Sequence, residues 1–125
     1  MQLEQLIKVS FNPDISPKAE WVNEFIQSIS KMDIELLERL LDDNHVYNDQ
    51  SKWDFLAHVR DVFGYNKQDG ASELLMRMEK CQVCKYGCPV HFFYSKEINR
   101  WMAFRLNFKG EQLTDIVICN MPTGL

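Results

Sequence analysis

The feature that most constrains the fold is a change in hydrophobic period near Ser72. Before this point, apolar residues recur at helical spacing, as on the face that carries Phe25 and Ile29. After it, apolar and polar residues alternate, as between Met102 and Phe108. Periods of about 3.6 and about 2 residues are typical of amphipathic helices and of half-buried strands. The chain is therefore predicted to be α+β, with helices first and a sheet after them.

Capping residues divide the first part into three helices. Ser16 can cap a helix whose first turn holds Pro17, and Asp33 can cap a second. Ser51, followed by an acidic residue three positions on, resembles a capping box for a third helix, which we expect to end at Gly64. We predict helices over about residues 17–32, 34–42 and 52–64, with a short strand at Val46 between the second and the third.

Four strands are predicted after Ser72, and their short connections make them an antiparallel meander. They fall near residues 74–79, 92–94, 102–108 and 113–121. The helices can cover only one face of this sheet. The last strand is apolar on both faces, with Ile116 on one and Val117 on the other. The uncovered face must therefore line a cavity or meet a partner.

The composition limits the function more than it defines it. The 125 residues are expected to form a single domain (1–125), with residues 1–15 as an N-terminal extension. The net charge is -4 and the basic residues are scattered, so we expect no binding to nucleic acid. No apolar run is long enough for a bilayer and no signal peptide is evident, so we expect no membrane association and a cytoplasmic location, where thiols stay reduced.

The segment "PKAEWVNEFIQSISKMDIELLERLLDDNHVYND", together with the order of elements, resembles the nuclear transport factor 2-like superfamily. This superfamily includes ketosteroid isomerases and polyketide cyclases, and the resemblance covers about residues 16–121. It implies that the helices pack on a curved, mostly antiparallel sheet and form a cone-shaped cavity. Members range from enzymes to binding modules and dimerisation domains, so the resemblance implies a pocket without an activity.

The resemblance also implies where catalytic residues would stand. The isomerases place a carboxylate base just after the first strand, a position that falls here at Asn48 or Asp49. They place an oxyanion-donating tyrosine on the first helix, but no tyrosine lies between Ser16 and Met32. The isomerase constellation is therefore at best half present.

The stretch "CQVCKYGCPVH" is the sharpest motif in the chain. Its spacing is C-x2-C-x3-C-x2-H, from Cys81, Cys84, Cys88 and His91. Thiolates three residues apart can reach one tetrahedral ion from a tight turn, and structural zinc takes four such ligands. These residues are therefore predicted to hold a structural zinc ion, with Cys119 as the other possible fourth ligand.

Hairpin geometry both supports and opposes the zinc prediction. A three-residue loop at 85–87 pairs Cys81 with His91 and Cys84 with Cys88. A similar loop at 110–112 pairs Cys119 with Ala103, too far from the hairpin tip to complete the site. In a regular hairpin, however, the two predicted pairs face opposite sides, so one ion could bind all four ligands only if the strand breaks near position 82.

Other interpretations of the cysteines remain open. They can be small apolar residues with no cofactor, or Cys84 and Cys88 can form a redox pair. The spacing also matches the last three cysteines of a bacterial ferredoxin run, with Met78 in place of the first.

Two functional hypotheses follow. The first is a non-catalytic module that binds a small apolar ligand or dimerises through the exposed face of its sheet. The second is an isomerase, cyclase or dehydratase with Asp49 as general base, aided by Tyr47 or His45, because these three residues would share one strand face. The residues predicted to bind ligand are Tyr47, Asp49 and Trp101.

Overall fold

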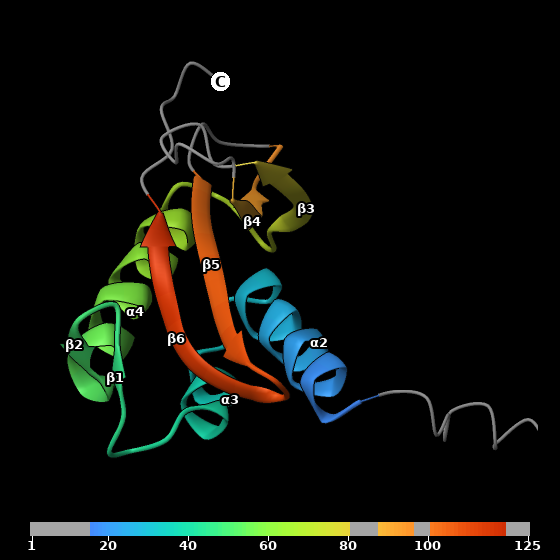
Figure 1. Cartoon of the computed structure of the whole chain (residues 1–125). Helices are drawn as coiled ribbons and strands as arrows, with labels where there is room; N and C mark the ends of the chain where they lie inside the picture. Colours follow the sequence, from blue (N-terminus) through green and yellow to red (C-terminus); the bar gives the residue numbers. More distant parts are fainter. Residues whose placement is uncertain (1–15, 81–87, 97–100, 120–125) are drawn as a thin grey trace, which may run out of the picture.

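The computed structural model describes residues 16–80, 88–96 and 101–119. Within these ranges three helices come first and an antiparallel four-stranded sheet follows, as the change of period predicts. The helices are α2 (Pro17–Ser30), α3 (Ile34–Leu40) and α4 (Lys52–Gln68). The strands are β1 (Val46–Tyr47), β2 (Gln50–Ser51), β3 (Leu75–Lys80), β4 (Pro89–Tyr94), β5 (Trp101–Lys109) and β6 (Gln112–Cys119). Figure 1 shows the long β5–β6 pair curving between α4 and α2, which confirms the α+β class with helices packed on a curved sheet.

All three helices begin at the predicted caps. The side chains of Ser16, Asp33 and Ser51 each accept a hydrogen bond from a backbone N–H three residues on, at 3.0 to 3.2 Å. The predicted end of the third helix at Gly64 is wrong, because α4 continues to Gln68. Gly64 is exposed and costs about 1 kcal/mol relative to alanine, and the buried residues on either side of it keep the helix packed.

The short strand at Val46 is one arm of a tight hairpin. Tyr47 pairs with Gln50, and the two residues between them, Asn48 and Asp49, have φ angles of 55° and 59°. Positive φ at both central positions is typical of a type I′ turn, which asparagine and aspartate tolerate. The prediction that Asp49 shares a strand face with Tyr47 is therefore wrong, since the chain has already turned.

A buried lysine joins this hairpin region to the helices. Lys52 is 3% exposed at the start of α4. Its ammonium donates to the Leu41 carbonyl just after α3 at 3.0 Å and pairs with the Asp43 carboxylate. The end of α3 and the start of α4 are thus held together by one cation.

The inner face of the sheet, which the helices cover, carries the main core. Phe25 of α2 meets Phe93 of β4 and Phe104 of β5 edge to face, with ring centroids 5.4 to 6.4 Å apart. Helices α3 and α4 add Leu37, Phe55, Val59 and Phe63 to the same cluster. Burial of these aromatic side chains, together with the aliphatic members of the cluster, holds the helices to the sheet.

The outer face of the sheet has a separate small cluster. Its buried members are Val90, Phe92 and Ala103, with Tyr94, Trp101 and Cys119 packed against them. None of the described helices contributes a residue to this cluster. Two apolar faces on one sheet match the alternation seen in the sequence.

The β5–β6 register agrees with the prediction, although the turn differs. The turn has two residues, Gly110 and Glu111, between the paired Lys109 and Gln112. A bulge beside Thr114 then shifts the register by one residue, so Ala103 lies opposite Cys119 as expected.

The predicted β3–β4 register is wrong. Met78 lies opposite His91 and Lys80 lies opposite Pro89, so Cys81 does not pair with His91. The predicted Cys84–Cys88 pair involves a residue outside the described ranges.

Helix α2 is tied to the start of the sheet at Ser30. Its hydroxyl donates to the Leu74 carbonyl at 2.6 Å, and the Leu74 N–H donates to the Ser30 carbonyl at 2.8 Å. These two bonds form a clasp between segments 44 residues apart.

Candidate ligand-binding cleft

The predicted zinc ligands are only partly within the described residues. Cys81 and Cys84 lie outside them, whereas Cys88 directly precedes β4 and His91 lies within it. Both are half-buried, and burial lowers the pKa of His91 below its usual 6.5. Over residues 16–80, 88–96 and 101–119, no three His, Cys, Asp or Glu side chains are grouped to hold a metal ion. Zinc at this hairpin stays a prediction, which elemental analysis of the purified protein would test.

Tyr47 is buried and bonded to the backbone. Its hydroxyl accepts a hydrogen bond from the Asp42 N–H at 2.9 Å, and burial raises its pKa above the usual 10. His45 packs against its ring, and the His45 Nε2 lies 2.7 Å from the Thr114 carbonyl, to which it must donate. Both line a depression of about 320 Å³ with Trp21. Although both residues line this depression, the Tyr47 hydroxyl and the His45 Nε2 are already bonded to backbone groups and hold the hairpin region in place.

The β1–β2 turn is fastened to the edge of β6. The Asn48 N–H donates to the Asp115 carboxylate at 3.0 Å, and the Asn48 side-chain oxygen accepts from the Ile118 N–H at 3.1 Å. Asp49, next in the turn, is exposed to solvent. A general base needs a site that holds substrate against it. Asp49 lines none of the depressions described here.

Trp101 lies at the opposite end of the sheet from the β5–β6 turn. It lines a small, mainly apolar pocket of about 150 Å³, formed where β5 begins and β6 ends beside α4. The other lining residues are His58 and Val62 of α4, Met102 and Ala103 of β5, and Ile118 and Cys119 of β6. The three predicted ligand-binding residues are therefore not brought together: Trp101 lines this pocket, Tyr47 lines another depression and Asp49 faces solvent.

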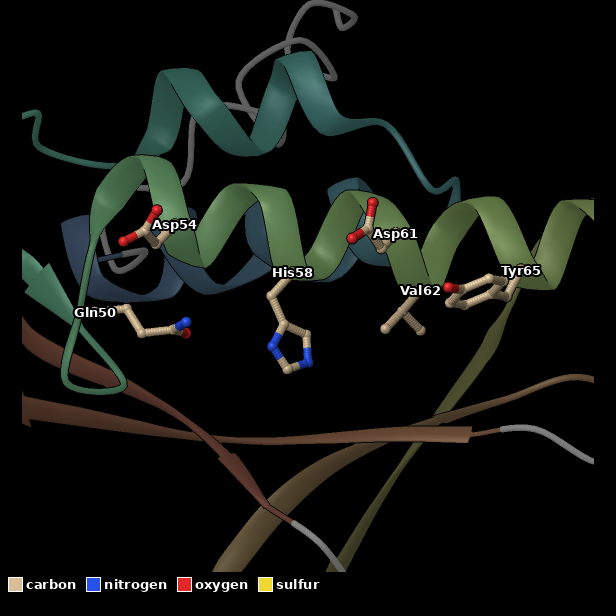
Figure 2. Close-up of a pocket in the computed structure, with 6 residues that line it drawn as sticks. All are labelled: Gln50, Asp54, His58, Asp61, Val62 and Tyr65. Atoms are coloured by element: carbon tan, nitrogen blue, oxygen red, sulfur yellow. The ribbon is translucent and has the colours of Figure 1, made fainter.

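A polar groove adjoins this apolar pocket. Figure 2 shows Gln50 on the β1–β2 hairpin and the other groove residues on α4, with His58 and Val62 projecting from the helix toward the strands. The groove has a volume of about 450 Å³ and is lined by Gln50, Asp54, His58, Asp61, Val62 and Tyr65. Because His58 and Val62 line both depressions, we treat the pocket and the groove together as one cleft.

The sequence carries a signal for the groove residues. Asp54, His58, Asp61 and Tyr65 follow one another at four, three and four residues, which places them on one helical face. That spacing predicts a polar stripe on a helix. It does not predict that an apolar pocket opens beside the stripe, because the pocket depends on where β5 begins and β6 ends.

Charge is distributed unevenly over the groove. The carboxylates of Asp54 and Asp61 form no hydrogen bond or ion pair with any described residue, and no lysine or arginine lines either part of the cleft. The groove is thus a negative surface next to an apolar pocket.

The outer face of the sheet is the other surface with a distinctive composition. The guanidinium of Arg77 lies 4.9 Å from the ring centroids of both Phe92 and Tyr94 and also pairs with Glu79. Trp101 packs on Phe92 with ring centroids 5.6 Å apart. An arginine among aromatic rings is a combination enriched at protein interfaces.

Comparisons with models of protein families, with curated proteins and with solved structures found no match. The resemblance to the nuclear transport factor 2-like superfamily therefore stays a prediction. In the part of the chain that the structure describes, no helix combines the length and apolar character needed to cross a bilayer.

Proposed function

We propose that this protein is a non-catalytic module that binds a small ligand in the cleft beside α4. The observation that carries the proposal is the pocket lined by Trp101, because it is apolar, partly enclosed by three elements and continuous with a groove. A cavity of about 150 Å³ lined by apolar side chains is large enough for a benzene ring. The acid–base candidates of the enzyme hypothesis lie elsewhere and are bonded to the backbone or exposed.

The expected affinity for a fragment is modest. A probe of about nine non-hydrogen atoms that gains about 0.5 kcal/mol from each binds with a Kd of about 1 mM. Burial of its ring against Val62 and Ile118 supplies most of this free energy. A natural ligand that also fills the groove would bind more tightly.

The test is a titration with 2-phenylethanol, followed by the backbone amide resonances of the 15N-labelled protein. We expect shifts at Val62, Trp101 and Ile118 that saturate at millimolar concentration. Val62→Phe fills the mouth of the pocket and should abolish them. Val46→Phe makes the same change on an exposed β1 position outside the cleft and should leave them intact. Shifts that persist in Val62→Phe would contradict the proposed site.

A second candidate function, homodimerisation, is favoured by the arrangement of Arg77, Phe92 and Tyr94 on the outer face. A two-fold dimer needs a surface that complements itself, and this face offers both a cation at Arg77 and a carboxylate at Glu79 beside apolar area. Sedimentation equilibrium tests this proposal. Leu75→Glu on the outer face should give monomers, whereas Val46→Glu on β1 should not. A wild-type chain that stays monomeric at about 100 μM, a concentration well above the Kd of a stable dimer, would rule it out.

A further inference from the structure

The two parts of the cleft differ in what they can bind. The inner pocket around Trp101 is apolar, whereas the outer groove carries Asp54 and Asp61. We propose that the ligand is an amphipathic cation: an apolar group about the size of a six-membered ring, with a protonated amine on a short chain. This inference rests on the proposed function, because it assumes that the cleft is the binding site.

The position of Asp61 relative to Val62 sets the expected orientation of the ligand. Val62 lines both parts of the cleft, and Asp61 precedes it directly on α4. Asp61 and Val62 both line the groove. We expect the chain of a ring packed against Val62 to extend along this groove, which brings its amine toward the Asp61 carboxylate. Tyr65, one turn farther on, adds an aromatic ring to the same end of the groove, and aromatic faces attract ammonium groups.

The charges of the helix do not neutralise this end of the groove. Arg60 and Lys67 are the basic residues of α4 closest to Asp61 in sequence, yet neither lines the cleft. Asp54 lies about 10 Å along the axis from Asp61, so it adds to the negative potential without sharing one ammonium group.

The charge of the groove favours a cation over other ligand classes. An anion would meet two carboxylates with no described cation in the cleft to offset them. A neutral apolar molecule would fill the inner pocket and leave the groove to water. A partly exposed ion pair contributes up to about 1 kcal/mol, so the amine should bind about fivefold more tightly than a neutral molecule of the same shape.

The test compares three probes that share one ring and one chain length: 2-phenylethylamine, 2-phenylethanol and 3-phenylpropionate. Titrations of the 15N-labelled full chain at low salt should give the amine the highest affinity and the carboxylate the lowest. The preference of amine over alcohol should shrink at high salt, since screening weakens exposed ion pairs.

Two variants test whether the preference for the amine comes from Asp61. Asp61→Asn should reduce the preference for the amine to less than about twofold and leave the affinity for the alcohol unchanged. Glu24→Gln removes the same charge from an exposed position on α2, outside the cleft, and should retain the preference.

The outcomes separate the two proposals. If the alcohol or the carboxylate binds the cleft as tightly as the amine, the cationic ligand is wrong and the proposed binding site stands. If Asp61→Asn and Glu24→Gln reduce the preference equally, the selectivity comes from net charge and the inference is wrong. If none of the three probes shifts the resonances of Val62 and Trp101, both the inference and the proposed function are wrong.

Discussion

The polar residues of the β1–β2 region and those of the α4 groove are similar in type but differ in their partners. His45, Tyr47 and Asn48 all bond to backbone groups of other segments. The carboxylates of Asp54 and Asp61 form no hydrogen bond or ion pair with any described residue. The first set fixes the fold, and the second is available to a ligand. Residue type alone does not separate the two sets, whereas the bonding partner does.

This comparison makes an energetic prediction. Removing a side chain that satisfies a buried backbone group leaves that group unpaired, at a cost of about 1 to 3 kcal/mol. Removing an exposed side chain without a partner changes stability by less than about 0.5 kcal/mol. The substitutions below test this difference, beginning with the largest expected effect.

Lys52→Ala should lower the free energy of unfolding by about 3 kcal/mol, because the Leu41 carbonyl loses its donor and the buried stem leaves a cavity. Urea denaturation measures the loss. Lys52→Met keeps most of the stem and should recover about half of it. A loss below about 1 kcal/mol in Lys52→Ala would mean that this buried contact does not stabilise the region.

Asn48→Ala should cost about 2 kcal/mol. Alanine is strained at a φ of 55°, and the Ile118 N–H loses its acceptor. Asn48→Gly tolerates the turn and loses only the hydrogen bond, so it should cost about 1 kcal/mol. Equal losses in the two variants, measured by urea denaturation, would show that turn strain contributes nothing.

His91 should make stability depend on pH. Burial lowers its pKa below 6.5 in the folded state, so the unfolded chain takes up a proton first as the pH falls. The stabilisation from a neutral His91 is complete above about pH 6.5 and decreases as the pH falls below that value. Urea midpoints at about pH 7.5 and about pH 5.5 should therefore differ less in His91→Gln than in the wild type. An equal difference in His91→Gln and in the wild type would contradict this prediction.

Asp61→Asn should have the smallest effect on stability, within about 0.5 kcal/mol of wild type, because its carboxylate has no described partner. Thermal unfolding without ligand measures this. A loss above about 1 kcal/mol would mean that the groove, like the β1–β2 region, is part of the structural framework.

Much of the fold follows from local sequence signals. Ser16, Asp33 and Ser51 begin helices where predicted, because capping depends on residues close in sequence. The β1–β2 turn was missed although the pair Asn48–Asp49 is a usable signal for positive φ. The end of α4 was misplaced because packing on the core outweighs one exposed glycine.

Register was harder to predict than element type. The β5–β6 pairing was right although the turn was assigned one residue too many, because the bulge beside Thr114 supplies the missing shift. The β3–β4 pairing has no bulge that offsets the error, and its predicted register was wrong: Met78, not Cys81, lies opposite His91. The cleft was harder still, since it forms between segments about 40 residues or more apart that only the folded chain brings together.

The clasp between Ser30 and Leu74 bears on how the chain folds. Helices α2 and α3 pack on near neighbours in the chain, and strands β3 to β6 pair in sequence order, so the contacts within each half are largely local. The entropic cost of closing a loop grows only slowly with loop length. Joining the two halves across 44 residues therefore costs little more than closing a shorter loop would. Because the helices and the sheet share one core, the two halves are expected to open together in hydrogen exchange, with the Leu74 amide protected only in the docked state.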